Sequence, residues 1–144
     1  MLNRLKDVFK SFQDRDVKYI VIGGIASIIH GVPRATFDLD ILIEATEENG
    51  KSLLAALEDA NFGTASLINV GTLLSNEITI FNDRVRVDVQ TSTPGISFQD
   101  AWERREILSY ESQSFFVLSK PDLIATKKAS GRSVDLEDVR ILEL

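Results

Sequence analysis

The sequence contains no cysteine and only one histidine. Without cysteine the chain forms no disulfide, binds no zinc through thiolates and has no thiol nucleophile. Because His30 is the single imidazole, any site that requires two histidines is also excluded. Catalysis or metal binding would therefore have to depend on carboxylates, hydroxyls and basic side chains.

Long apolar segments are missing as well. No run approaches the ~20 residues that a membrane span requires, and the first twelve residues, MLNRLKDVFKSF, lack the apolar core of a signal peptide. We therefore expect a cytoplasmic protein that does not engage a membrane. The 144 residues are 44% hydrophobic and 26% charged, which predicts one globular domain over residues 1–144 with a substantial core.

Positive charge is in deficit, and the formal net charge is −6. Residues 1–36 hold six basic and three acidic side chains, a balance of +3, whereas residues 37–144 hold ten and nineteen, a balance of −9. Non-specific affinity for nucleic acid comes largely from neutralising phosphates. The charge balance argues against a DNA-coating role and leaves a nucleotide site open, provided that local basic groups or a metal meet the phosphates.

The hydrophobic pattern changes between helical and strand periods and predicts an α/β (α+β) fold, a mixed β-sheet with flanking helices. Residues 77–81 and 84–90 resemble a hairpin across Asn82-Asp83, and residues 62–76 show no clear period. The other expected strands are 18–23, 38–43, 106–110 and 114–118, and the expected helices are 2–14, 24–30, 47–60, 97–105, 119–130 and 135–144.

Residues 19–44, YIVIGGIASIIHGVPRATFDLDILIE, are the most informative stretch. Side chains alternate across a strand, so Asp38 and Asp40 share one face while Leu39, Ile41 and Ile43 bury on the other. Two adjacent like charges repel, and Mg²⁺ removes the repulsion because it binds carboxylate oxygens and keeps positions open for substrate phosphate. The pattern predicts a metal site.

The strict alternation of RVRVDVQ, residues 84–90, makes Asp88 the candidate for a third carboxylate. If its strand lies beside the first, three carboxylates can hold two Mg²⁺ ions roughly 3.5–4 Å apart, a geometry suited to displacement at phosphorus. The alternative is that Asp88 pairs with Arg86 or Arg84 on a solvated strand face.

Gly23 and Gly24 stand at a strand-to-helix turn, where free N–H groups and the positive end of the helix dipole favour phosphate. The alternative is that they serve only backbone geometry. Ser27, one turn later, either adds a hydroxyl to a phosphate or lies on an ordinary helix surface. Arg34 and Thr36 either position phosphate or Asp38, or anchor their loop.

Lys127, Lys128 and Arg132 cluster near the end of a predicted helix. Basic residues there also favour the helix dipole, and Arg132 has Asp135 and Asp138 within reach as ion-pair partners. A solvated helix end is therefore an alternative to a phosphate site. His30, next to Gly31, is expected to make a structural hydrogen bond.

The combination of motifs resembles the nucleotidyltransferase superfamily with the DNA polymerase β type of fold, and in particular the small stand-alone nucleotidyltransferases related to abortive-infection toxins. That signature is a diglycine turn, a short helix, Asp-x-Asp on the next strand and a third Asp later. The matching residues are Gly23, Gly24, Ala26, His30, Gly31, Arg34, Thr36, Asp38, Asp40, Asp88, Lys127, Arg132, Asp135 and Asp138.

The resemblance implies Mg²⁺-dependent transfer of a nucleoside monophosphate from an NTP to a hydroxyl acceptor, with Lys127 and Arg132 reaching the triphosphate. Two departures are Val134, where the family often has a basic residue, and a short helical portion after residue 119. The acceptor (RNA, protein or small molecule) would then be recognised with a partner protein or a homo-oligomer. The alternatives are an inactive nucleotide- or partner-binding module of a toxin–antitoxin pair and a metal-dependent phosphohydrolase.

Overall fold

The structure is a computed structural model that describes residues 2–144. The expected helices and strands are present, and residues 62–76 form two short helical segments. In chain order the elements are α1 (Leu2–Asp14), β1 (Tyr19–Ile22), α2 (Gly23–Ile29), β2 (Asp38–Ile43), α3 (Glu47–Asp59), η1 (Gly63–Leu67), α4 (Val70–Ser75), β3 (Ile78–Asn82), β4 (Arg86–Gln90), α5 (Phe98–Arg104), β5 (Glu106–Tyr110), β6 (Gln113–Val117), α6 (Lys120–Ser130) and α7 (Ser133–Leu142).

The strands form one mixed sheet in the order β3-β4-β2-β1-β6-β5, which confirms the predicted α/β class. β1 runs antiparallel to β2 and parallel to β6, while β2 runs parallel to β4. The β3–β4 and β5–β6 pairs are antiparallel hairpins. The first hairpin turns over residues 83–85, one residue more than the predicted two-residue turn.

The two faces of the central strands differ as the alternation predicted. Leu39, Ile41 and Ile43 are fully buried, and in the parallel register Leu39 lies opposite Val87 and Ile41 opposite Val89. This face is apolar throughout β2 and β4. The opposite face carries Asp38 and Asp40, so the same register that builds the core also fixes where the carboxylates lie.

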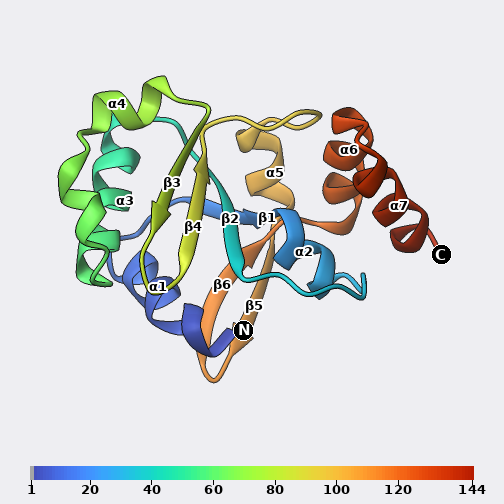
Figure 1. Ribbon diagram of the computed structural model, residues 1–144, viewed down its shortest axis with the longest axis horizontal. Coiled ribbons are helices and arrows are strands. Elements are labelled where there is room, and N and C mark those ends of the chain that lie inside the picture. Colours follow the sequence, from blue (N-terminus) through green and yellow to red (C-terminus); the bar gives the residue numbers. More distant parts are fainter. Residues whose placement is uncertain (1) are drawn as a thin grey trace.

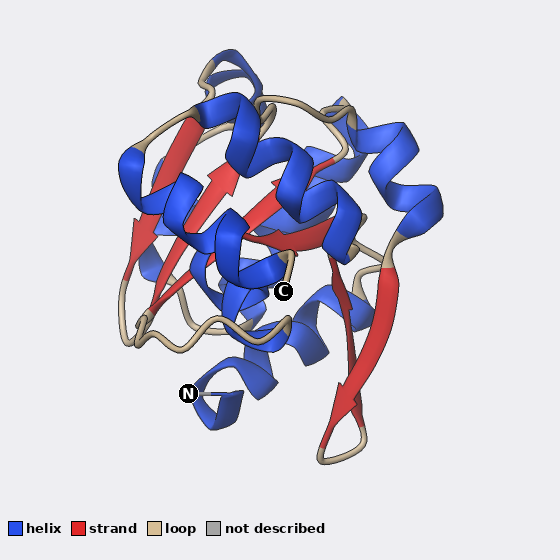
Figure 2. Ribbon diagram, turned by 90° about the vertical axis from the view of Figure 1, so that its right-hand side faces the viewer, coloured by secondary structure: helices blue, strands red, loops and turns tan. Residues whose placement is uncertain are grey.

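Helix α1 closes the apolar side of the sheet. Its Phe9 ring stacks on Phe115 of β6, with ring centroids 4.7 Å apart, and Phe12 packs at the same separation against Tyr19 of β1. Helices α3 and α4 continue this layer, to the left of the sheet in Figure 1, with α6 and α7 at the other end. The loop of the β5–β6 hairpin extends beyond the rest of the molecule (Figure 2).

Helices begin where short polar side chains cap them. Thr46, Ser97 and Ser119 each accept a hydrogen bond from the backbone N–H three residues later and so cap α3, α5 and α6. Gly50 lies within the first turns of α3 for a packing reason, because an added Cβ would lie 2.6 Å from Val70 Cγ2 of α4. Within residues 2–144, every helix is too short or too polar to cross a membrane.

Candidate active site

The register of two parallel strands brings the predicted carboxylates together. Asp40 of β2 lies opposite Asp88 of β4, and Asp38 lies opposite Arg86. Because residues two apart share a face, the three carboxylates and the guanidinium all belong to the face away from α1. The condition set by the sequence, that the strand of Asp88 lies beside that of Asp38 and Asp40, is therefore met.

This face opens into a cavity of about 470 Å³, which is within the size range of small-ligand sites. Its walls come from β1, β2, β3 and β4 on one side and from α6 and α7 on the other. The lining residues are Ile22, Gly23, Asp38, Asp40, Ile78, Asp88, Gln90, Thr93, Pro94, Leu123, Thr126, Lys127, Ser130, Arg132 and Asp135.

Asp40 fits against the diglycine turn. Gly23 has a φ of +67°, and a Cβ there would lie 2.4 Å from Asp40 Oδ2. Burial raises the pKa of Asp40 to about 6, helped by the negative charges of Asp88 and Asp38 and by a hydrogen bond shared with Asp88, while the Gly24 N–H lowers it. The diglycine thus has a visible structural function, which is to make room for one carboxylate and bind it.

Asp88 has two kinds of neighbour at once. It lies beside Asp40, and it also accepts two hydrogen bonds from Arg86, from Nε at 2.8 Å and from Nη2 at 3.1 Å. Arg86 Nε is 3.8 Å from the nearer oxygen of Asp38. The ion-pair alternative is therefore observed, and the pair with Arg86 forms within the carboxylate cluster, whereas the role of Asp88 as a metal ligand stays a prediction.

The donor set fits a hard divalent cation, since three carboxylates share one face and their mutual repulsion raises the pKa of Asp40. Among residues 2–144, however, no group of three or more histidine, aspartate or glutamate side chains is already arranged to hold a metal. The bidentate contact with Arg86 occupies both oxygens of Asp88. Asp88 would have to leave Arg86 to complete a ligand set.

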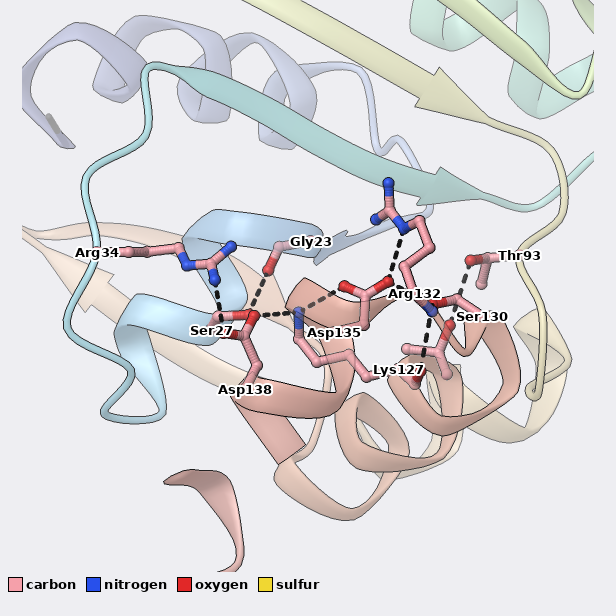
Figure 3. Close-up of polar contacts among 10 residues, drawn as sticks. Gly23, Ser27, Arg34, Thr93, Lys127, Ser130, Arg132, Asp135 and Asp138 are labelled. Carbon is pink, nitrogen blue, oxygen red and sulfur yellow. Dashed lines mark hydrogen bonds and ion pairs between the residues drawn. The ribbon is translucent and has the colours of Figure 1, made fainter. Parts of the chain in front are cut away.

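A network of ion pairs forms the opposite wall of the cavity (Figure 3). The Lys127 ammonium lies 2.8 Å from Asp138 and 3.4 Å from Asp135, and its side chain is only 7% exposed. Arg34 reaches the other oxygen of Asp138 at 2.6 Å. Arg132 contacts Asp135 at 2.8 Å with its side chain 74% exposed, so it presents positive charge to solvent and to the cavity.

Asp135 stays ionised within this network. Burial by itself would raise the pKa of its carboxyl, but hydrogen bonds from Arg132 and Ser130 and the charges of Lys127 and Arg132 together lower the pKa below its usual value. Three cations, Arg34, Lys127 and Arg132, thus face two carboxylates. The network carries a formal charge of +1, opposite in sign to the carboxylate face.

Several residues predicted from the sequence lie away from the cavity wall in the described chain. Ser27 is fully buried and donates to the Gly23 carbonyl at 3.0 Å, so its hydroxyl points back into its own helix. Arg34 binds Asp138, which corresponds to the loop-anchoring alternative. Thr36 accepts a hydrogen bond from the Asp38 N–H at 3.4 Å, and the Gly24 N–H is directed to Asp40. His30 contacts the Leu118 carbonyl at 2.7 Å, as its expected structural role requires.

The cavity also includes residues to which the sequence gave no site role. Gln90 follows Asp88 by two positions, so strand alternation could have placed it on the same face. Ile78 lies at the cavity because the hairpin register places it opposite Gln90. Thr93 lies there because it forms a hydrogen bond with Thr126 of α6 at 3.3 Å. The contact between Thr93 and Thr126 links distant segments, and no local pattern signals it.

The fold and the site define an α/β protein with a carboxylate-lined cavity suited to a charged ligand. Residues 2–144 match the model of the family described as "Nucleotidyltransferase of unknown function (DUF6036)". The match covers nearly the whole chain, so the protein belongs to this family. A comparison with curated proteins gives no match.

Proposed function

We propose that this protein is a Mg²⁺-dependent nucleotidyltransferase that moves a nucleoside monophosphate from an NTP to a hydroxyl acceptor. Asp38, Asp40 and Asp88 would hold the metal, with two ions as the expected number. Membership of the nucleotidyltransferase family supports the reaction class. The acceptor would be an RNA, a protein or a small molecule, met with the help of a partner protein or a second copy of the chain.

One observation carries the proposal. Asp40 and Asp88 stand in register on adjacent parallel strands, and the cavity that they line has Lys127 and Arg132 on its opposite wall. A triphosphate bound with divalent metal needs carboxylates on one side for the metal and positive charge on the other for the phosphate oxygens. Arg132 is the better placed of the two cations, because Lys127 is already paired with two carboxylates.

The reaction consists of one displacement at the α-phosphorus. The acceptor oxygen forms a bond to phosphorus, the bond to the bridging oxygen breaks, and pyrophosphate leaves with that electron pair. We assign acceptance of the hydroxyl proton to Asp88, once it has been released from Arg86. When bound, the metal would lower the pKa of the attacking hydroxyl and neutralise charge on the phosphates. The contribution of Arg132 is to bind the triphosphate and the departing pyrophosphate.

Binding is tested by thermal unfolding with each NTP and Mg²⁺. A ligand that binds the folded state raises the melting temperature, and at 100 times its dissociation constant it adds about 2.7 kcal/mol. We expect a rise for at least one NTP and none for the same NTP with EDTA. Absence of a shift with every NTP at millimolar concentration would contradict the proposal.

Transfer is tested by incubating the protein with each α-labelled NTP in cell lysate and identifying the labelled product. We expect label in one class of acceptor, and Asp40→Asn should abolish it. Release of inorganic phosphate with no labelled acceptor would instead identify a phosphohydrolase.

A catalytically inactive binding module is the second candidate, and the Arg86–Asp88 ion pair favours it because that pair covers a proposed ligand. A module of a toxin–antitoxin pair would show NTP-dependent stabilisation and co-purify with a small protein partner. It would produce neither labelled acceptor nor free phosphate. The two assays together therefore separate all three functions.

A further inference from the structure

Arg86 lies among the carboxylates as a consequence of the sheet itself. It precedes Asp88 by two residues on β4, so both side chains project from the same face, and the parallel register places it opposite Asp38 of β2. Any molecule in which β2 and β4 pair in this way brings the guanidinium to the site. Its position is therefore as strongly determined as that of the carboxylates.

Arg86 contacts the carboxylate oxygens that a divalent metal ion would bind. Nε and Nη2 donate to the two oxygens of Asp88, and Asp38 lies 3.8 Å away. Mg²⁺ requires near-octahedral oxygens at about 2.0–2.1 Å and is repelled by a guanidinium in the same place. Guanidinium and metal therefore compete for Asp88, and the formal charge of the cluster changes from −3 without Arg86 to −2 with it.

The exposure of the Arg86–Asp88 ion pair allows it both to form and to separate. Asp88 is 14% exposed, which favours a bidentate, charge-assisted contact. The Arg86 side chain is 39% exposed, so it can swing toward solvent or the cavity without breaking the core. An ion pair of this kind has two arrangements, closed on Asp88 or released from it.

We propose that Arg86 is a resident counter-ion that closes the carboxylate site in the metal-free protein and must release Asp88 before a divalent cation binds there. The inference rests on the proposed function, because it concerns loading of the same site. Because guanidinium and metal compete for Asp88, metal binding opens the Arg86 contact, and removing Arg86 tightens metal binding by the factor by which the closed pair had weakened it. Arg86 thus sets the metal concentration at which the site fills.

The test is a titration with Mn²⁺, followed by the electron paramagnetic resonance signal of the free ion, in wild type, Arg86→Gln and Arg84→Gln. Arg84 is the matched control because it belongs to the same segment but donates to the Ala60 carbonyl at 3.3 Å. We expect Arg86→Gln to bind Mn²⁺ roughly three- to tenfold more tightly than wild type, as loss of a competing ion pair implies. Arg84→Gln should match wild type. Arg86→Lys should fall between the two, because lysine keeps the charge but loses the fork geometry.

Unchanged or weaker Mn²⁺ binding by Arg86→Gln would overturn the inference. In that case the proposed function would still stand if wild type binds Mn²⁺ and Asp40→Asn abolishes this binding. If neither wild type nor Arg86→Gln binds Mn²⁺ at millimolar concentration, the proposed function fails as well.

A second measurement uses wild type alone and therefore does not depend on whether the variants fold. Mg²⁺ should accelerate hydrogen exchange of the Arg86 Nε–H in nuclear magnetic resonance spectra, and an unaffected signal would contradict release.

Discussion

Asp40 lies where it does because a side chain is missing at Gly23. A Cβ at that position would lie 2.4 Å from the Asp40 carboxylate, and the backbone there has a φ of +67°, which side chains other than glycine rarely adopt. The sequence leaves open whether the diglycine favours phosphate or serves only backbone geometry. In the structure its immediate effect is to accommodate a half-buried acid.

Gly23→Ala should therefore impair both stability and metal binding. Gly31→Ala is the matched control, because Gly31 also has a positive φ, +107°, but no atom within 4 Å of an added Cβ. We expect Gly31→Ala to cost about 1 kcal/mol in unfolding free energy through backbone strain alone. Gly23→Ala should cost more and weaken Mn²⁺ binding. Equal effects of the two variants in denaturation and in Mn²⁺ titration would show that the close approach to Asp40 is unimportant.

The protonation of Asp40 links stability to pH. Its pKa in the folded protein is about 6, above the usual value of 3.8, so between these values the folded state binds a proton that the unfolded chain has released. The contribution of Asp40 to the unfolding free energy in EDTA should therefore be most favourable below about pH 4 and fall as pH rises through 6, by an amount of order 1–3 kcal/mol.

Asp40→Asn removes this dependence. In urea denaturation with EDTA, the variant should match wild type near pH 4 and exceed it at pH 7.5, because the asparagine carries no charge beside Asp38 and Asp88. A stability difference that does not grow between the two pH values would show that Asp40 is not strained by its neighbours.

At the scale of elements, α6 and α7 are joined to the rest of the molecule by buried charge. Lys127 of α6 meets Asp135 and Asp138 of α7, and Arg34, in the loop before β2, binds Asp138 from the other side. Two consecutive helices and a loop about a hundred residues earlier thus share one carboxylate. The loop that leads into the Asp38 strand is held by the same helix that closes the cavity.

Asp138→Asn should destabilise the protein by roughly 2–4 kcal/mol, because it leaves the buried Lys127 and the partly exposed Arg34 without their common partner. Glu137→Gln is the matched control on the same helix, since Glu137 pairs with Arg140 on the surface and an exposed pair contributes at most about 1 kcal/mol. Both values come from chemical denaturation at neutral pH. A cost for Asp138→Asn no larger than that for Glu137→Gln would mean that the network does not join these elements.

On the scale of the whole molecule, the sheet joins early and late segments of the described chain. β1 pairs in parallel with β6, and α1 packs its aromatic side chains against Tyr19 and Phe115. The central strands are therefore completed by residues nearly a hundred positions later. No described segment of the sheet could be removed without exposing the apolar face shared by the others.

We expect unfolding to be one cooperative transition, as the single sheet and the prediction of one domain both imply. Trp102, the single tryptophan, packs against Phe116 of β6 and reports on that end of the sheet through its fluorescence. Its urea transition should coincide with the far-ultraviolet circular dichroism transition, which reports on all helices. Separate midpoints would reveal two independently folding units.

Much of the fold could be predicted because its signals are local. Alternation in residues 38–43 and 84–90 assigned the buried and polar faces of β2 and β4 correctly, and capping side chains marked helix starts. The carboxylate cluster could be anticipated for the same reason. The secondary structure of residues 62–76 could not be predicted, because η1 and α4 are too short to show a hydrophobic period.

The sequence by itself determined which acids share a face, because backbone pleating fixes that at a spacing of two residues. Tertiary structure alone decided which distant groups meet: Arg86 lies near Asp38 through strand register, and Arg34 binds Asp138 across more than a hundred residues. The physical reason is that a charged or hydroxyl side chain has many possible partners of similar energy. Which one it binds depends on how the strands and helices pack, and that is a property of the whole chain.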